Sequence, residues 1–167
     1  MTFPYRRILN PIDFDENSME AVEVAAGFAR QNGGTVILLH VIPAFPIPRG
    51  PLDDTTGGLP AHTIAEDQAR ARLEEIARKH LQGVENQLLI LLGSPAASIL
   101  GAAADFAADV IVMATHGRTG FSRAFFGSIA EEVLREAPCP VLTVHSSAPM
   151  FDHILLERYP GTRRNNL

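Results

Sequence analysis

The segment DVIVMATHGRTGFSRAFFGSIAEEVLREAPCPVLTVH, residues Asp109–His145, decides the fold of this chain. It opens with the apolar run DVIVM and closes with the β-branched run PVLTVH. Between these runs, apolar residues recur at helical spacing, at Ala130, Val133, Leu134 and Ala137. A strand, a helix and a second strand in this order predict a parallel strand pair with a right-handed crossover. The connection between the first strand and the helix is much longer than the usual ~2–6 residues, which suggests that it has a function.

The same alternation of strand and helix patterns covers the chain before this segment. Apolar runs typical of buried parallel strands occur at residues 35–42 and 86–92, and the segment 5–13 contains a shorter apolar run that is also a strand candidate. Helical patterns separate them and end near glycines, at Gly33 and Gly83. The sequence therefore predicts one α/β domain, residues 1–146, with a parallel sheet of five strands and four helices. Residues 147–167 form a tail whose apolar residues (Ile154, Leu155, Leu156, Tyr159) would either dock on this subunit or a partner, or fray.

Polar residues before the helical patterns predict where the helices begin. A side chain that accepts from the first free amides is favoured at this position, often with Glu three residues later or Pro directly after it. The predicted cap pairs are Asn17 with Glu20, Thr63 with Glu66, and Ser94 with Pro95.

Composition narrows the class of protein. The chain has 167 residues, of which 46% are apolar and 20% charged, as expected of a soluble globular domain. A net charge of −5 gives no electrostatic case for nucleic-acid binding, and no apolar run approaches a membrane span. The N-terminus lacks a signal-peptide pattern, so a cytoplasmic location is expected. The single cysteine, Cys139, forms no internal disulfide and is interpreted as a structural rather than a reactive thiol.

Polar and glycine residues follow the first and fourth strands. Asn10, Pro11 and Asp13 follow the first strand, and the long connection follows the fourth. In open parallel sheets, ligands bind beyond the carboxyl ends of the strands, where the strand order reverses. If these two strands are neighbours, both loops meet at that crevice. The helix that starts near Gly127 then directs its N-terminus, a favourable place for an anion, into the same space.

Two readings of the long connection remain open at this point. Arg118 and Arg123 would add charge-assisted contacts to a phosphorylated ligand, and Gly127 would allow close approach of the backbone. Alternatively, the glycines serve simple turns, and Ser128 with Glu131 forms a capping box that needs no ligand.

Three segments carry a family resemblance: NPIDFDENS (10–18), LLHVI (38–42) and residues 114–145. With them the chain resembles the universal stress proteins over about residues 5–145. The resemblance implies a three-layer, adenine nucleotide α-hydrolase-like sandwich with strand order 3-2-1-4-5. The nucleotide-binding branch of the family carries Gly, two residues, Gly, nine residues, then Gly-Ser or Gly-Thr. Gly117 and the pair Gly127-Ser128 fit this spacing, and Ala114 replaces the first glycine.

The resemblance also implies roles for individual residues. Asp13 would contact the nucleoside or help to hold Mg²⁺, and the backbone of Val41 would recognise adenine. Alternatively, Asp13 is a turn or helix-cap residue, and Val41 is an ordinary strand residue. His116 is interpreted as a pocket residue rather than a general base, because no orienting carboxylate is evident. The implied nucleotide-binding residues are Pro11, Asp13, Val41, Ala114, Thr115, His116, Gly117, Arg118, Gly120, Gly127, Ser128 and Ile129.

The sequence thus favours an ATP-binding regulatory protein of the stress response, with Mg²⁺ bridging the phosphates and at most slow hydrolysis. It would form a homodimer through the strand Val141–His145 and act on an unknown regulatory protein. The alternative is a nucleotide-free, dimeric interaction module of the same fold. An enzyme of a related fold is disfavoured, because NPIDFDENS lacks the glycine-rich motif such enzymes carry after the first strand.

Overall fold

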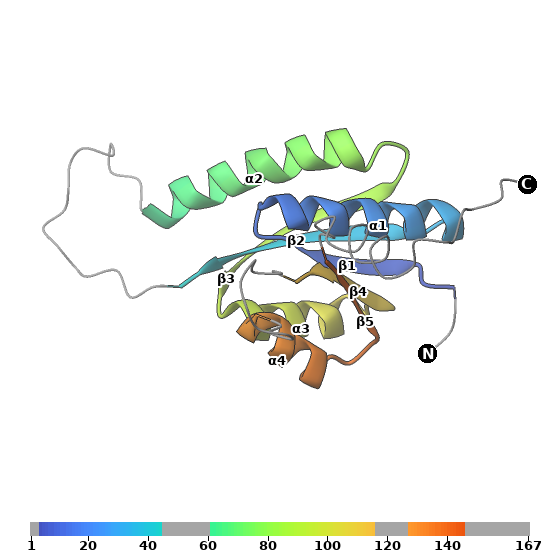
Figure 1. The fold of residues 1–167 in the computed structure, drawn as a ribbon. Coiled ribbons are helices and arrows are strands. Elements are labelled where there is room, and N and C mark those ends of the chain that lie inside the picture. The colour runs from blue at the N-terminus through green and yellow to red at the C-terminus, as the bar shows by residue number, and fades with distance from the viewer. Residues whose placement is uncertain (1–3, 45–60, 116–126, 146–167) are drawn as a thin grey trace, which may run out of the picture.

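A computed structural model describes residues 4–44, 61–115 and 127–145 of the chain. These residues form five strands and four helices that alternate along the sequence (Figure 1). The strands are β1 (Arg7–Pro11), β2 (Thr35–Pro43), β3 (Glu85–Gly93), β4 (Val110–Ala114) and β5 (Val141–Val144). The helices are α1 (Glu16–Asn32), α2 (Ala61–His80), α3 (Pro95–Asp105) and α4 (Ser128–Glu136).

The strands form a single parallel sheet in the order β3-β2-β1-β4-β5. Helices α1 and α2 cover one face of the sheet, and α3 and α4 cover the other (Figure 1). The predicted α/β sandwich and its strand order are therefore confirmed. The predicted tail, residues 147–167, and the segment 45–60 lie outside the described residues.

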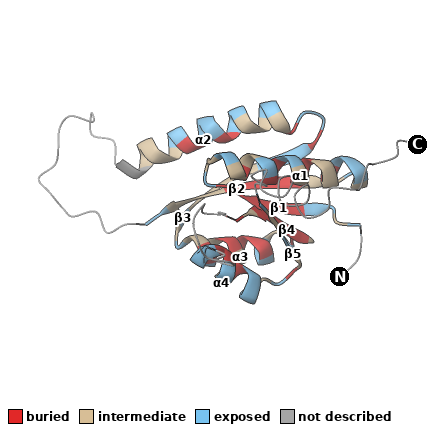
Figure 2. Ribbon diagram, viewed as in Figure 1, coloured by how far each residue is buried: buried red, intermediate tan, exposed pale blue. Residues whose placement is uncertain are grey.

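Buried side chains on both faces of the sheet hold the three layers together. Because successive strand residues point to opposite faces, Ile8 of β1 packs under α1 while Leu9 packs under α3 and α4. Neither residue is exposed to solvent, and burial is concentrated in the central strands (Figure 2). None of the helices within residues 4–44, 61–115 and 127–145 is both long and apolar enough to span a membrane.

The start of α1 differs from the predicted cap at Asn17. The N-cap is Asp15, whose carboxylate accepts a 2.7 Å hydrogen bond from the backbone N–H of Ser18. Both Asp15 and Asn17 are good capping residues, so local sequence alone does not choose between them. The helix ends as predicted, at Gly33 in the left-handed conformation (φ 62°).

The predicted start of α2 is also wrong. Helix α2 begins at Ala61, two residues before Thr63, because Thr is tolerated within a helix at small cost. Helix α4 starts near Gly127, as expected: Gly127 is the N-cap and Ser128 is already helical, so the alternative capping box of Ser128 with Glu131 is not formed. The predicted N-cap of α3 is confirmed: Ser94 precedes Pro95 at the first helical position.

The central strands β1 and β4 separate toward their carboxyl ends. They pair only at Ile8–Val110 and Leu9–Ile111, whereas β1 continues to pair with β2 as far as Pro11. Beyond Leu9, the side-chain amide of Asn10 donates a 2.7 Å hydrogen bond to β4 in place of the backbone. The separation opens a space where the strand order reverses.

Candidate functional site

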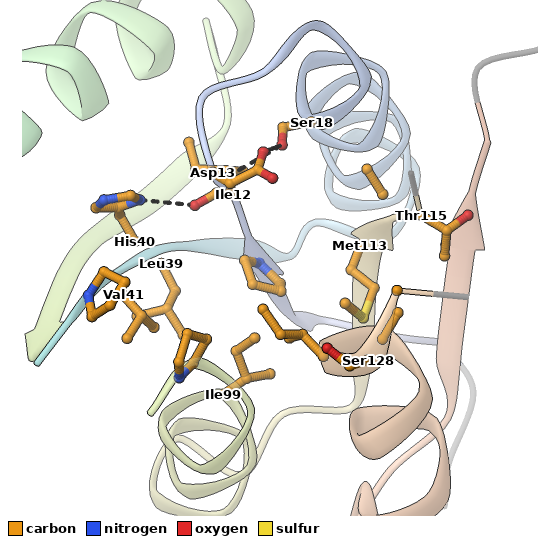
Figure 3. A pocket seen from close by; sticks show the side chains of 17 residues that line it. Ile12, Asp13, Ser18, Leu39, His40, Val41, Ile99, Met113, Thr115 and Ser128 are labelled. Atoms are coloured by element: carbon orange, nitrogen blue, oxygen red, sulfur yellow. Dashed lines mark hydrogen bonds between the residues drawn. The ribbon is translucent and has the colours of Figure 1, made fainter. Parts of the chain in front are cut away.

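A pocket of about 350 Å³ occupies the space where β1 and β4 separate (Figure 3). Its walls come from the carboxyl ends of β1, β2 and β4 and from the N-terminal turns of α3 and α4. This is the position at which open parallel sheets bind ligands. The volume lies within the range of small-molecule sites, ~300–1,000 Å³.

Eight of the residues that the sequence predicts for the binding site line this one pocket. They come from four separate parts of the chain, which the strand order brings together. They are Pro11, Asp13, Val41, Ala114, Thr115, Gly127, Ser128 and Ile129. The other four predicted residues, His116, Gly117, Arg118 and Gly120, lie outside the described residues. The structure thus groups the eight, while their part in binding stays a prediction.

Sequence reasoning missed the apolar floor of the pocket. Leu39, Ile99 and Met113 line it, and each is at most 5% exposed. All three belong to the core cluster beneath α3 and α4. The signal was available for Leu39, because it lies two residues before Val41 and a strand repeats its face every second residue. Nothing in the periodicity of α3 indicated that Ile99 faces a ligand site rather than ordinary core.

The N-terminus of α4 opens onto this pocket. Its N-cap, Gly127, has no side chain to accept from the first amides, and the first intrahelical bond runs from the N–H of Glu131 to the carbonyl of Gly127. The amides of Ser128, Ile129 and Ala130 precede this bond and have no acceptor within the helix. These three residues line the pocket, so the positive end of the helix dipole faces it. Such an arrangement favours an anionic ligand.

Asp13 lies at the opposite side of the pocket, in a network at the start of α1. Its carboxylate accepts from the hydroxyl of Ser18 and, at 3.3 Å, from the backbone N–H of Asp15 (Figure 3). The turn role that the sequence left open is therefore present. The side chain also remains exposed and lines the pocket, so it can meet a ligand or a cation as well.

Thr115 connects the pocket to the edge strand β5. The residue is 4% exposed, and its backbone N–H donates to the carbonyl of Val144 at 2.9 Å. Its hydroxyl oxygen lies 2.6 Å from Nδ1 of His145. The last described residue of the pocket wall on this side is thus held by the end of β5.

Within the described part of the chain, no three His, Cys, Asp or Glu side chains come close enough to hold a metal ion. A divalent cation in this pocket would therefore need ligand oxygens in addition to Asp13. Cys139 lies outside the pocket, in the core beneath α4. Burial, and next the negative charge of Asp109, raise the pKa of its thiol, while a hydrogen bond to the backbone of Ile111 opposes them. These are the surroundings of an unreactive thiol.

The fold and the pocket define a doubly wound α/β protein with a ligand-sized site at its topological switch point. The model of the universal stress protein family matches residues 4–145. The chain belongs to this family.

Individual relatives agree with this assignment. The chain is 28% identical to universal stress protein MJ0577 of Methanocaldococcus jannaschii, over 86% of this chain and 97% of the relative. The solved structure of MJ0577 superposes with a TM-score of 0.70 at 30% identity, covering 86% and 97% of the two chains.

Two further solved structures share the fold at lower identity. A universal stress protein in complex with cAMP has a TM-score of 0.61 at 19% identity, covering 86% of this chain and 98% of its own. The universal stress protein of Archaeoglobus fulgidus in complex with dAMP has a TM-score of 0.58 at 22% identity, covering 86% and 99%. The fold that the resemblance implied is thus the fold of these proteins.

Proposed function

We propose that this protein binds an adenine nucleotide, ATP in the first instance, in the pocket between β1, β2 and β4. The observation that carries the proposal is the N-terminus of α4, where amides without an acceptor in the helix face an apolar pocket behind a cap that has no side chain. A nucleotide matches both parts, because its base is flat and apolar and its phosphates are anionic acceptors. The family members solved with cAMP and dAMP support an adenine nucleotide as the class of ligand.

The residues present fit this ligand in a definite orientation. The base would lie against Leu39, Val41 and Met113, and the phosphates would accept from the amides that follow Gly127. A Cβ built on Gly127 meets no atom of the described residues within 4 Å, which leaves room beside them for a phosphate. When bound, Mg²⁺ would neutralise phosphate charge, with Asp13 as its nearest carboxylate on the described pocket wall.

Binding would serve regulation rather than turnover. Among the pocket residues that the structure describes, the titratable groups are Asp13 and His40. Asp13 accepts from Ser18, and His40 is hydrogen-bonded to the carbonyl of Ile12, so both already take part in structural hydrogen bonds. We therefore assign the protein to the stress response as a cytoplasmic nucleotide-dependent regulator, with at most slow ATP hydrolysis and a protein partner still to be identified.

The proposed assembly is a homodimer through β5 and His145. This strand ends the sheet on one side within the described residues, and Leu142 on it is 38% exposed. An edge strand with unpaired backbone groups readily pairs with a second copy. Sedimentation at micromolar concentration is expected to show a dimer, and a monomer alone would overturn this assembly.

Calorimetric titration with ATP and Mg²⁺ tests the nucleotide site directly. We expect saturable binding, and we expect Gly127→Val to raise Kd about tenfold or more, because the added side chain displaces a phosphate from charge-assisted hydrogen bonds. Gly101→Ala is the control, since Gly101 is exposed on α3 and a Cβ there also meets open space. No heat at millimolar ATP would favour the nucleotide-free interaction module. If Gly127→Val and Gly101→Ala bind ATP with equal affinity, the proposal that phosphates bind at the N-terminus of α4 is wrong.

A further inference from the structure

Phe14 has a backbone conformation that aromatic residues rarely adopt. Its φ is 68°, in the left-handed region that favours glycine. The residue lies between Asp13, which lines the pocket, and Asp15, which caps α1. A bulky residue keeps such a conformation only when its surroundings hold it, and such residues gather at functional sites.

Two side chains from other elements hold the ring of Phe14. The ring of His40, on β2, lies with its centroid 4.2 Å from that of Phe14, at an angle of 36° between the planes. The guanidinium carbon of Arg72, on α2, lies 4.1 Å from the Phe14 centroid, over the ring. A cation in this position is attracted by the electrons of the ring face. Phe14 is therefore joined to β2 and to α2.

His40 extends this arrangement to the wall of the pocket. Its Nδ1 lies 2.9 Å from the carbonyl oxygen of Ile12, toward which the ring points in Figure 3. Because a carbonyl only accepts, Nδ1 carries the proton and donates. The N–H of Ile12 in turn donates to the carbonyl of Leu39 at 2.8 Å. Both backbone polar groups of Ile12, a pocket residue, are thus held by β2.

We propose that Arg72, Phe14 and His40 form a positioning stack that sets the geometry of the pocket wall at Ile12 and Asp13. Through it, α2 acts on ligand affinity although Arg72 does not line the pocket. The strained turn at Phe14 would relax to another conformation without the two contacts, and would move Asp13 with it. The proposal rests on the proposed nucleotide site for its affinity readout.

The test compares Arg72→Gln with Arg78→Gln; both arginines are exposed residues of the same helix. Arg72→Gln is expected to raise the Kd for ATP with Mg²⁺ by about two- to fivefold, the size of one cation–π contact. It is also expected to speed hydrogen exchange at the amide of Ile12 in the nucleotide-free protein. Arg72→Lys, which keeps a cation, should restore both. Phe14→Ala should have the larger effect, because it removes both ring contacts.

Two sets of results are decisive. The stack is overturned if two variants, Arg72→Gln and Phe14→Ala, have the same ATP affinity as Arg78→Gln and the same hydrogen-exchange rate at the amide of Ile12. An Arg72→Gln effect that Arg72→Lys does not restore would also overturn it, because the attraction of a cation would then not be the cause. If the unaltered protein binds no ATP, the nucleotide proposal fails, and the exchange measurements alone decide whether the stack positions the wall.

Discussion

The side-chain nitrogen of Asn10 donates a 2.7 Å hydrogen bond to the carbonyl oxygen of Val112, across the two central strands. Both residues are wholly buried. The bond lies directly after the last backbone pair between β1 and β4, Leu9 with Ile111. It therefore holds the strands together at the point where they separate to form the pocket.

Asn10→Ala is expected to destabilise the protein by about 1–3 kcal/mol, because it leaves the buried carbonyl of Val112 without its donor. Asn86→Ala is the matched control. The side chain of Asn86 also donates to a carbonyl, that of Val84 at 3.0 Å, but the residue is exposed. Its loss should cost less than about 0.5 kcal/mol in urea unfolding. Equal costs would show that the buried bond does not hold the strands.

Asp15→Ala is expected to cost about 1 kcal/mol of stability, because the amide of Ser18 loses its acceptor at the start of α1. Asp15→Asn should retain most of the stability that the cap contributes, since an amide oxygen also caps helices. Asn17→Ala, at the cap position expected from sequence, should have little effect. Thermal or urea unfolding of the three variants measures their relative stabilities. A larger loss of stability for Asn17→Ala than for Asp15→Ala would contradict the observed cap.

Gly34→Ala should destabilise the protein by about 1–3 kcal/mol through steric overlap. A Cβ at this position would lie 2.4 Å from the carbonyl oxygen of Arg6, which accepts from the N–H of Thr35 and so cannot easily move. Gly27→Ala in α1 makes a sharp contrast, since a Cβ there meets open space. It should stabilise by about 0.5–1 kcal/mol, the difference in helix propensity. The same sign for both variants would contradict the crowding at Gly34.

The stability of the protein should fall in alkali partly because of Cys139. Burial and Asp109 raise the pKa of this thiol in the folded chain above its ordinary value of 9.0. Above that value the unfolded chain loses the proton before the folded chain does, so stability present at lower pH is lost as pH rises. Cys139→Ala should show a weaker decline of stability in urea unfolding as the pH rises above about 9. Parallel declines would contradict a raised pKa.

Much of the fold could be predicted because buried segments have recognisable local patterns of apolar residues. The continuous apolar run of β2 indicates a strand that is covered on both faces. Gly33, which adopts the left-handed conformation, indicates the end of a helix. That eight of the predicted residues lie near one another could be expected, because the family motifs place them after particular strands. The N-cap of α1 at Asp15 could not, since Asn17 two residues later is an equally good cap.

By itself, the sequence determined which segments are strands and helices and which faces they bury, because these depend on the spacing of apolar residues a few positions apart. Only the tertiary structure decided what meets at the pocket. Asn10 meets Val112, and Phe14 meets His40 and Arg72, across long stretches of chain. Such contacts depend on how whole helices and strands pack against one another. A pattern that spans a few neighbouring residues does not specify which distant residues come into contact.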